Sequence, residues 1–399
     1  MSERLKIVVT GLANTFPFGG VFWDYLQYPL GFHRMGQDVL YIEDTGRWVY
    51  DVVLQTFAES GKNNVELLAG WIEQLEPELK DRWFIRDAGN VEYGRSAAYV
   101  KEFCKSADLF LHVSASCWMR DEYFACKKVA FIDSDPIYTQ SGVPLYLDGT
   151  INDLSRSQVD MLRKHGLHFT FAENIGAADC KVPSELFNWI PTRQPIVMDC
   201  FAKHQVPVSK RRRVMTTVAS WEPNEKGPLV NGVQYVGKSA EFKKFLPLAK
   251  KSKLPLEVAI SGDVPRDMLN QAGWQLRAGH EVSGNPWEYR DFLANSLGEW
   301  SVAKNAYVAS RSGWFSCRTA CYLALGVPAV VQDTGFSKYI RTGEGLISFN
   351  SIDEAAAGIE EIDAHPEKHA RAALEIAREY FDSTKVLNQL IDNAGIRRN

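Results

Sequence analysis

The chain has 399 residues, of which 45% are hydrophobic and 24% charged, and its formal net charge is −4. This composition is typical of a globular protein, and the slightly acidic balance gives no electrostatic basis for general nucleic-acid binding or for binding an anionic membrane surface. At roughly 150 residues per domain the length predicts two domains, whereas the composition leaves the oligomeric state open.

The first residues, Met1-Ser2-Glu3-Arg4, lead directly into an apolar run and lack the features of a signal peptide. No apolar run reaches the roughly 18 residues that a transmembrane helix needs. We therefore expect a cytoplasmic protein without a transmembrane segment. The seven cysteines are scattered without Cys-x-x-Cys spacing, so neither a disulfide framework nor a zinc site is predicted.

The first predicted unit consists of a strand at residues 6–10, a loop at 11–20, a helix that ends before Gly36 and a second strand at 39–42. The crossover of such a βαβ unit is right-handed, which places the loop at the carboxyl edge of a parallel sheet. Ligands of open α/β sheets bind at this edge, so the loop is a candidate part of a binding site.

A nicotinamide dinucleotide site is one alternative for this unit, with Glu43 or Asp44 binding a ribose. The loop glycines at positions 11, 19 and 20 do not match Gly-x-Gly-x-x-Gly, the spacing that lets a backbone approach a pyrophosphate. The sequence therefore disfavours this alternative.

Residues 50–100 are predicted to be mainly helical and charged, and residues 108–114 to form another buried strand. His112 lies within this strand. It is a candidate general base, because a neutral imidazole accepts a proton near pH 7. The alternative is a histidine whose hydrogen bonds are satisfied in the core.

A further predicted strand at residues 128–132 runs into Asp133 and Asp135. Side chains two positions apart in a strand point the same way, so repulsion between the carboxylates would raise the pKa of one of them toward that of a useful base. Asp135, ahead of Asp133, is therefore a candidate catalytic base at the sheet edge. Turn chemistry explains both residues equally well, since Asp133 can cap a turn and Asp135 precedes a proline.

After a predicted strand at residues 168–172, the stretch 183–207 contains four prolines and little periodicity, which is typical of a connection between domains. We therefore predict an N-terminal domain at residues 1–200, a C-terminal domain at 201–375 and a terminal helical segment at 376–399.

The second domain shows the same alternation of apolar runs and polar loops, which predicts a second α/β sheet. The predicted strands are at residues 214–219, 256–261, 274–282 and 306–310, with an amphipathic segment at 289–301. The loop after the first of these strands is Ser220-Trp221-Glu222-Pro223, and the third strand ends in Gly279-His280-Glu281-Val282.

Residues 311–336 predict a tight turn at Gly313, a short helix that begins near Ser316 and ends at Gly326, and a buried strand at 328–332. The start of this helix combines free backbone N–H groups with two hydroxyls and a guanidinium, from Ser316, Thr319 and Arg318. Such an amino end suits a phosphate.

Arg318 strengthens the case for an anion, because a cation in the first turn opposes the helix dipole and an anionic partner would compensate. Asp333-Thr334-Gly335 follows the buried strand at the carboxyl edge of the sheet, where ligands bind. The alternative is that Ser316 is an ordinary N-cap and that the segment binds nothing.

Three parts of this segment, Gly313-Trp314-Phe315-Ser316, Gly326-Val327-Pro328 and Asp333-Thr334-Gly335, together resemble the donor-binding segment of nucleotide-sugar glycosyltransferases with the GT-B fold. Two positions depart from that pattern. Cys321 stands where retaining members often have a ribose-binding glutamate, and Ser312 replaces the histidine that often precedes Gly-Trp in plant-type members. The resemblance therefore assigns no subfamily.

The resemblance implies two Rossmann-like domains that face each other across a cleft, and transfer of a sugar from a nucleotide-diphosphate donor to an unidentified acceptor, without a metal or other cofactor. It implies diphosphate neutralisation by the helix start and close approach of the glycine loop from the first domain. The loop with His280 would contact the base. The implied donor site comprises Gly19, Gly20, Trp221, His280, Val282, Arg311, Ser312, Gly313, Ser316, Arg318, Thr319, Asp333 and Thr334.

If the reaction inverts, Asp135, Asp133 or His112 would deprotonate the acceptor. GT-B enzymes commonly end in a helix that crosses back to the first domain, which residues 376–399 would provide. A nucleotide-sugar epimerase and a non-catalytic nucleotide-sugar-binding protein of the same fold are the alternatives. The identity of the sugar, the nucleotide and the acceptor stays open.

Overall fold

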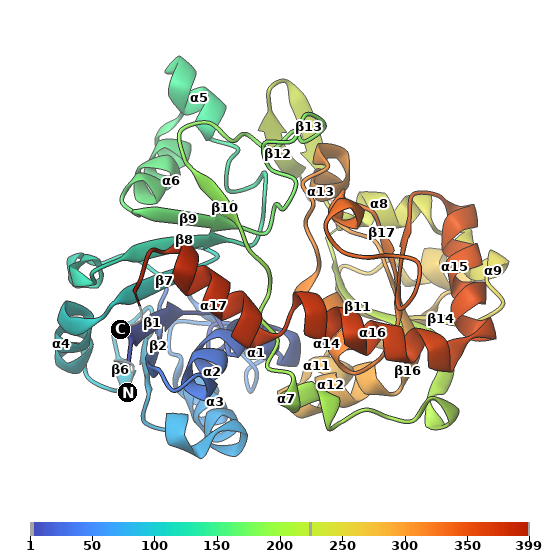
Figure 1. Ribbon diagram of the computed structural model, residues 1–399, viewed down its shortest axis with the longest axis horizontal. Coiled ribbons are helices and arrows are strands. Elements are labelled where there is room, and N and C mark those ends of the chain that lie inside the picture. The colour runs from blue at the N-terminus through green and yellow to red at the C-terminus, as the bar shows by residue number, and fades with distance from the viewer. Residues whose placement is uncertain (1–3, 223–225, 398–399) are drawn as a thin grey trace.

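The computed structural model describes residues 4–222 and 226–397. Met1–Glu3 of the expected start and Pro223 of the predicted loop lie outside the described residues. Two parallel sheets organise the chain, one in each half, as Figure 1 shows in blue to green and in yellow to red. The predicted α/β class with two Rossmann-like domains is confirmed.

The first sheet has the strand order β10-β9-β8-β7-β1-β2-β5-β6, and only β6, at one edge, runs antiparallel to its neighbour among the described strands. Its central strands are apolar runs buried on both faces, as a sheet covered by helices requires. The strands are β1 (Lys6–Thr10), β2 (Asp38–Asp44), β5 (Trp83–Arg86), β6 (Glu92–Gly94), β7 (Leu109–Val113), β8 (Val129–Asp133), β9 (Leu167–Thr170) and β10 (Trp189–Pro191). A separate hairpin consists of β3 (Val49–Asp51) and β4 (Thr56–Ala58).

The helices of this half are α1 (Gly19–Tyr25), α2 (Gln27–Arg34), α3 (Lys62–Leu75), α4 (Ala97–Ser106), α5 (Val143–Asp148) and α6 (Asp153–Arg163). Two predictions for this half are corrected. Residues 50–100 contain the β3–β4 hairpin and strands β5 and β6 beside the two helices. The proline-rich connection contains the edge strand β10, which tolerates Pro191 because an edge strand need not donate every backbone hydrogen bond.

The second sheet has the order β15-β14-β11-β16-β17-β18 and is parallel throughout these strands. They are β11 (Arg212–Trp221), β14 (Leu256–Gly262), β15 (Gln275–Ala278), β16 (Ser296–Ser301), β17 (Ala329–Gln332) and β18 (Leu346–Phe349), and a hairpin consists of β12 (Lys226–Val230) and β13 (Val233–Val236). The helices are α7 (Asp199–Ala202), α8 (Lys238–Lys244), α9 (Leu248–Lys251), α10 (Arg266–Gln271), α11 (His280–Ser283), α12 (Pro286–Ala294), α13 (Asn305–Ser310), α14 (Cys317–Ala324) and α15 (Ile352–Ala364).

The strand predicted at residues 306–310 is wrong. This segment is helix α13, and the strand before the 311–336 segment is β16. Gly298 and Glu299 interrupt the apolar pattern of β16 and concealed it. A Cβ at Gly298 would lie 2.6 Å from the Met215 methyl carbon, so the glycine reflects close packing of strand on strand.

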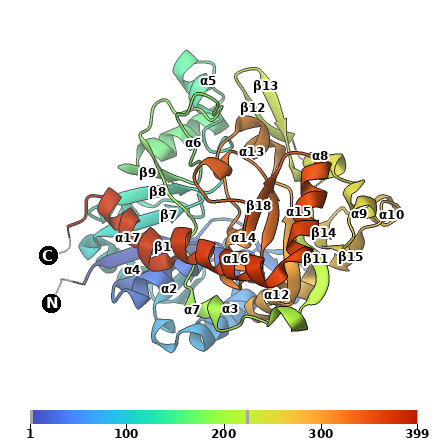
Figure 2. The same ribbon diagram turned by 45° about the vertical axis from the view of Figure 1, so that its right-hand side comes forward.

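The last two helices, α16 (Pro366–Tyr380) and α17 (Ser383–Asn393), lie along one side of the molecule, and α17 packs on α2 of the first half (Figures 1 and 2). A Cβ at Gly31 would lie 2.5 Å from a Leu387 methyl carbon, which shows how closely these helices approach. The Ile196 N–H donates to the Phe381 carbonyl over 2.7 Å, and the Ser383 N–H donates to the Ile196 carbonyl over 2.8 Å. The chain passes between the halves near Ile196 and again near Phe381, and these two segments are thus hydrogen-bonded to each other.

Candidate functional site

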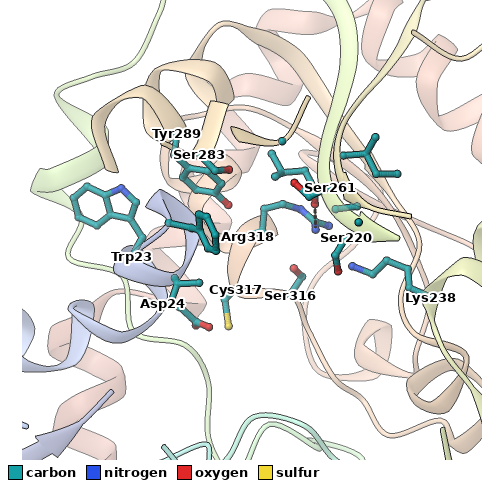
Figure 3. Close-up of a pocket in the computed structure, with 18 of the residues that line it drawn as sticks. Trp23, Asp24, Ser220, Lys238, Ser261, Ser283, Tyr289, Ser316, Cys317 and Arg318 are labelled. Atoms are coloured by element: carbon teal, nitrogen blue, oxygen red, sulfur yellow. Dashed lines mark hydrogen bonds between the residues drawn. The ribbon is translucent and has the colours of Figure 1, made fainter. Parts of the chain in front are cut away.

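A cavity of about 860 Å³ lies between the two sheets, at the carboxyl edges of strands from both halves. The first half contributes α1, the loop before it and residues that follow β8. The second half contributes the ends of β11 and β14 and the amino end of α14. Figure 3 shows Asp24 beside Cys317 on one side of Ser316, and Lys238 beside Ser220 on the other.

The amino end of α14 opens into this cavity. Ser316 is its N-cap, and both Ser316 and Arg318 line the cavity and are partly exposed. Gly313 has φ +80°, which a glycine adopts without strain, and a Cβ there would lie 2.6 Å from the Asn174 amide nitrogen of the first half. The predicted helix start is therefore confirmed, with the turn pressed against the opposite domain.

Arg318 already has an anionic partner within the protein. Its Nε donates to Glu299 Oε1 over 2.7 Å and its guanidinium also donates to the Val218 carbonyl over 2.7 Å. Burial opposes the charge of this guanidinium, but the Glu299 carboxylate raises its pKa above the ordinary value. The expectation that Arg318 needs a ligand anion is therefore corrected, because Glu299, fully buried on β16, compensates it.

Other cations on the second-half wall were missed by the sequence analysis. Lys238 and Arg266 line the cavity at the starts of α8 and α10, and Lys304 lines it after β16. Each is a lone basic residue in its local sequence, so no motif marks it. The sequence did hold one indication of a role at the cavity. Lys238 and Arg266 each lie in the connection that follows a strand, and such connections gather at the carboxyl edge of a sheet.

Asp24 on α1 is a further group that the sequence analysis missed. It lines the cavity and is partly buried. Burial raises the pKa of Asp24 to about 6, the charge of Asp135 adds to this effect, and a hydrogen bond with Cys317 opposes it. The sequence Phe-Trp-Asp-Tyr around Asp24 is typical of an ordinary amphipathic helix. It therefore does not indicate that this carboxylate faces a binding site.

The two aspartates after β8 have different environments. Asp135 lines the cavity, and its Oδ1 accepts hydrogen bonds from Lys304 Nζ over 3.0 Å and from the Tyr307 hydroxyl. Asp133 is fully buried below it and accepts hydrogen bonds from three side chains, those of Thr139, Gln140 and Thr170. Asp133 therefore holds the turn together and is not a base that faces the cavity.

His112 is 1% exposed and lies in the core rather than at the cavity. Its Nδ1 is 3.1 Å from His165 Nε2, and its Nε2 accepts a hydrogen bond from the Cys117 N–H. Burial, followed by the proximity of His165, holds the pKa of His112 well below its usual value. The general-base interpretation of His112 is wrong, and the core alternative is correct.

Of the other implied donor residues, Gly20 and His280 line the cavity. Gly19 is pressed against α12, since a Cβ there would lie 2.4 Å from the Asn285 carbonyl oxygen, so its close approach is to the protein. Trp221, Val282 and Thr319 are buried in the second half and do not line the cavity.

Of the remaining four positions, Arg311 joins the two halves, and the other three form hydrogen bonds within the second half. Arg311 Nε donates to Asp179 Oδ2 over 3.0 Å, and the Ser312 hydroxyl donates to the Tyr307 carbonyl. Asp333 accepts a hydrogen bond from the Gly335 N–H, while the Thr334 hydroxyl donates to the Trp314 carbonyl. Arg311, Ser312, Asp333 and Thr334 do not line the cavity, and the contacts that the structure gives them are within the protein.

The dinucleotide alternative is also contradicted, since both candidate ribose ligands are occupied. Glu43 accepts hydrogen bonds from the Asn14 N–H over 2.6 Å and from the Tyr41 hydroxyl over 2.6 Å. Asp44 is paired with Arg86 and Arg120. Among the described residues, no group of three or more metal-ligating side chains converges, and no helix is long and apolar enough to cross a bilayer.

The sequence matches no protein-family model and no curated protein. Solved structures do match along nearly the whole chain. An α-glucosyltransferase in complex with UDP and DNA has a TM-score of 0.60 at 10% identity and covers 98% of this chain and 100% of its own. The chain has the GT-B fold.

Two further GT-B structures extend this likeness. AviGT4, a glycosyltransferase involved in avilamycin A biosynthesis, has a TM-score of 0.57 at 10% identity, with 98% and 97% of the two chains covered. HepE from Anabaena in complex with UDP-glucose has a TM-score of 0.53 at 11% identity, with 98% and 100% covered. The predicted GT-B fold is therefore confirmed over nearly the whole chain.

Proposed function

We propose that this protein is a glycosyltransferase that binds a nucleotide-diphosphate sugar in the cavity and transfers the sugar to an acceptor that enters from the first half. The observation that carries this proposal is the amino end of α14, which opens into the interdomain cavity beside Lys238 and Arg266. UDP is the first candidate nucleotide, because structural neighbours bind UDP or UDP-glucose.

The donor diphosphate would dock against the amino end of α14. Backbone N–H groups and the Ser316 hydroxyl offer hydrogen bonds there, and Lys238 and Arg266 offer positive charge from the starts of α8 and α10. These groups would stabilise the charge that develops on the leaving diphosphate, a task that fixed dipoles and cations perform without a metal. Unchanged turnover in excess EDTA is the expected result, and loss of turnover that Mg²⁺ restores would contradict the metal-free proposal.

The nucleotide base would lie against the ends of β14 and β15. Gly262 and Gly279 both line the cavity there, and a Cβ at Gly279 would lie 2.0 Å from the Ser261 hydroxyl oxygen. This packing brings the backbone close to the cavity next to His280, which supports base recognition by backbone groups.

We assign deprotonation of the acceptor to Asp24 in preference to Asp135. Asp135 already accepts hydrogen bonds from Lys304 and Tyr307 on the same carboxylate oxygen, so that oxygen is engaged within the protein. Asp24 faces the same cavity from α1, and its raised pKa suits proton transfer near neutral pH. The acceptor hydroxyl would attack the anomeric carbon, its proton would pass to Asp24, and the bond to the diphosphate would break.

A thermal-shift screen with UDP-, GDP-, TDP- and ADP-sugars tests the donor site. A ligand at a hundred times its dissociation constant stabilises a protein by about 2.7 kcal/mol, which is readily measured. The Lys238→Ala variant should lose about half of the shift, while Lys243→Ala, on the same helix but away from the cavity, should retain it. No shift with any of these donors would contradict the proposal.

A further inference from the structure

Four aromatic side chains continue the first-half wall of the cavity out to the protein surface. This aromatic cluster consists of Phe16, Phe18, Tyr50 and Phe57. Phe18 and Tyr50 line the cavity with ring centroids 5.3 Å apart, and Tyr50 and Phe57 follow at 5.7 Å. Phe16 packs on Phe57 at 6.3 Å, and Phe57 is 53% exposed. Apolar surface therefore runs without interruption from the cavity to solvent.

The cluster is built on a short hairpin that buried polar groups fix in place. Tyr50 and Phe57 are directly opposite each other in the β3–β4 pair, so their rings share one face. The Tyr50 N–H donates to the Thr15 carbonyl over 2.9 Å. Asn64, fully buried, donates to the carbonyls of both Asn14 and Tyr50, over 2.9 and 2.8 Å.

The glycine loop that carries Phe16 and Phe18 is fixed in the same way. The buried Glu43 carboxylate accepts hydrogen bonds from the Asn14 and Thr15 N–H groups, just before the two phenylalanines. The buried Glu43 carboxylate and the buried Asn64 amide thus fix the loop and the hairpin that carry the aromatic cluster. Such preorganisation lowers the entropic cost of binding a ligand.

The chemistry of the cluster favours carbohydrate. An aromatic face is electronegative and attracts the electropositive C–H faces of a pyranose ring, while apolar burial adds to the attraction. The two centroid spacings are comparable with the length of one pyranose residue along a glycan, so successive sugar units can meet successive rings. Residues 44–64 carry two basic and three acidic side chains, which is not the cationic track that a nucleic-acid strand needs.

We propose that the acceptor is a saccharide chain whose rings stack on the aromatic cluster and whose terminal hydroxyl reaches the cavity next to Asp24. This proposal rests on the proposed glycosyl transfer, since it names the acceptor class of the same site. Phe57 would bind a sugar unit outside the cavity, and Phe18 and Tyr50 would orient the reacting unit within it.

A glycan array that includes bacterial polysaccharides and oligosaccharides of graded length tests the proposal with fluorescently labelled protein. We expect binding to one glycan class, tighter for longer chains, and weakened at least about tenfold in Phe57→Ala and in Tyr50→Ala. Leu54→Ala is the matched control, because Leu54 is an exposed aliphatic residue on the same hairpin outside the cluster. It should bind like the original protein.

Absence of binding to every glycan, or glycan binding that Phe57→Ala leaves unchanged, would overturn the saccharide acceptor. So would preferential, Phe57-dependent binding to a single-stranded oligodeoxynucleotide or to phosphatidylcholine–phosphatidylglycerol vesicles. The UDP-induced thermal shift, measured in the same variants, separates the two proposals. A retained shift with no glycan binding rejects only the acceptor class, whereas glycan binding without any nucleotide-sugar shift rejects only the donor site.

Discussion

The second-half wall of the cavity presents cations and a helix start, whereas the first-half wall presents a carboxylate and aromatic rings. Lys238, Arg266 and the amino end of α14 suit a fixed anion, while Asp24 and the aromatic cluster suit a neutral, hydroxyl-bearing partner. In the proposed reaction, this division would place the leaving group and the nucleophile on separate domains. Domain closure would therefore both bring the reactants together and exclude water.

The largest effect is expected from Arg318→Ala, which tests whether the second-half wall depends on its internal ion pair. Removal of one partner leaves Glu299 buried and uncompensated, which costs about 3–5 kcal/mol of unfolding free energy. Urea denaturation measures this loss, and the double variant Arg318→Met with Glu299→Gln should recover most of it. Arg318→Ala with unchanged stability would show that the pair is dispensable.

Asp24→Asn should lower kcat about 10²- to 10⁴-fold without weakening UDP binding, because the proposed base acts on the acceptor and not on the donor. In the original protein, kcat should rise with pH through about 6, where Asp24 loses its proton, and this rise should be absent from the variant. Asp135→Asn is the control. A product that retains the donor's anomeric configuration, seen by NMR, would contradict this role of Asp24.

The same substitution should also change stability, in the opposite direction to activity. The pKa of Asp24 is raised in the folded state, so its protonated form is favoured there, and stability falls as pH rises from the unfolded pKa toward about 6. Asp24→Asn removes this loss. Its melting temperature should exceed that of the original protein near pH 7 and match it near pH 4, and a pH-independent difference would indicate another cause.

Lys238→Ala should weaken UDP binding by about tenfold, since a charge-assisted hydrogen bond to phosphate contributes about 1.5–3 kcal/mol and solvent screening reduces this at a partly exposed site. Titration calorimetry at two salt concentrations checks the assignment. The original protein should lose affinity at high salt more steeply than the variant. If the variant and the original protein bound UDP with equal affinity, Lys238 would not contact the phosphate.

The smallest effect on turnover is expected from His112→Gln. His112 lies in the core of the first half, so kcat and the UDP dissociation constant should stay unchanged. The lost contact with His165 should lower the unfolding free energy by about 1–3 kcal/mol. A drop in kcat without a loss of stability would restore His112 as a catalytic candidate.

The sequence predicted one wall of the cavity better than the other for a physical reason. Gly313 and Ser316 form a local turn and helix start, whose signals lie within a few residues, and these were correctly located. The pKa of Asp24 is raised by burial beside Cys317, a residue nearly three hundred positions away in the sequence. Lys238 reaches the cavity only because segments that are distant in sequence pack together. Such long-range proximity has no local signal.

The errors have the same origin. His112 lies near the carboxyl end of its strand and Asp133 at the end of its own, where catalytic groups also occur, and only the fold shows that their partners are core groups. The charged Glu299 interrupts the apolar pattern of β16, and its partner, Arg318, lies on helix α14 outside the strand's local sequence. The α/β architecture was predicted from many apolar runs along the chain. It therefore stayed correct although single residues and one strand were assigned wrongly.

The hydrogen bonds that join Ile196 to Phe381 and Ser383 have a consequence for motion. Both chain segments that link the halves pass through this one place, so a relative rotation of the halves would have to turn about these two hydrogen-bonded segments. In the proposed reaction, such a rotation would admit the substrates and release the products without separating the two covalent links.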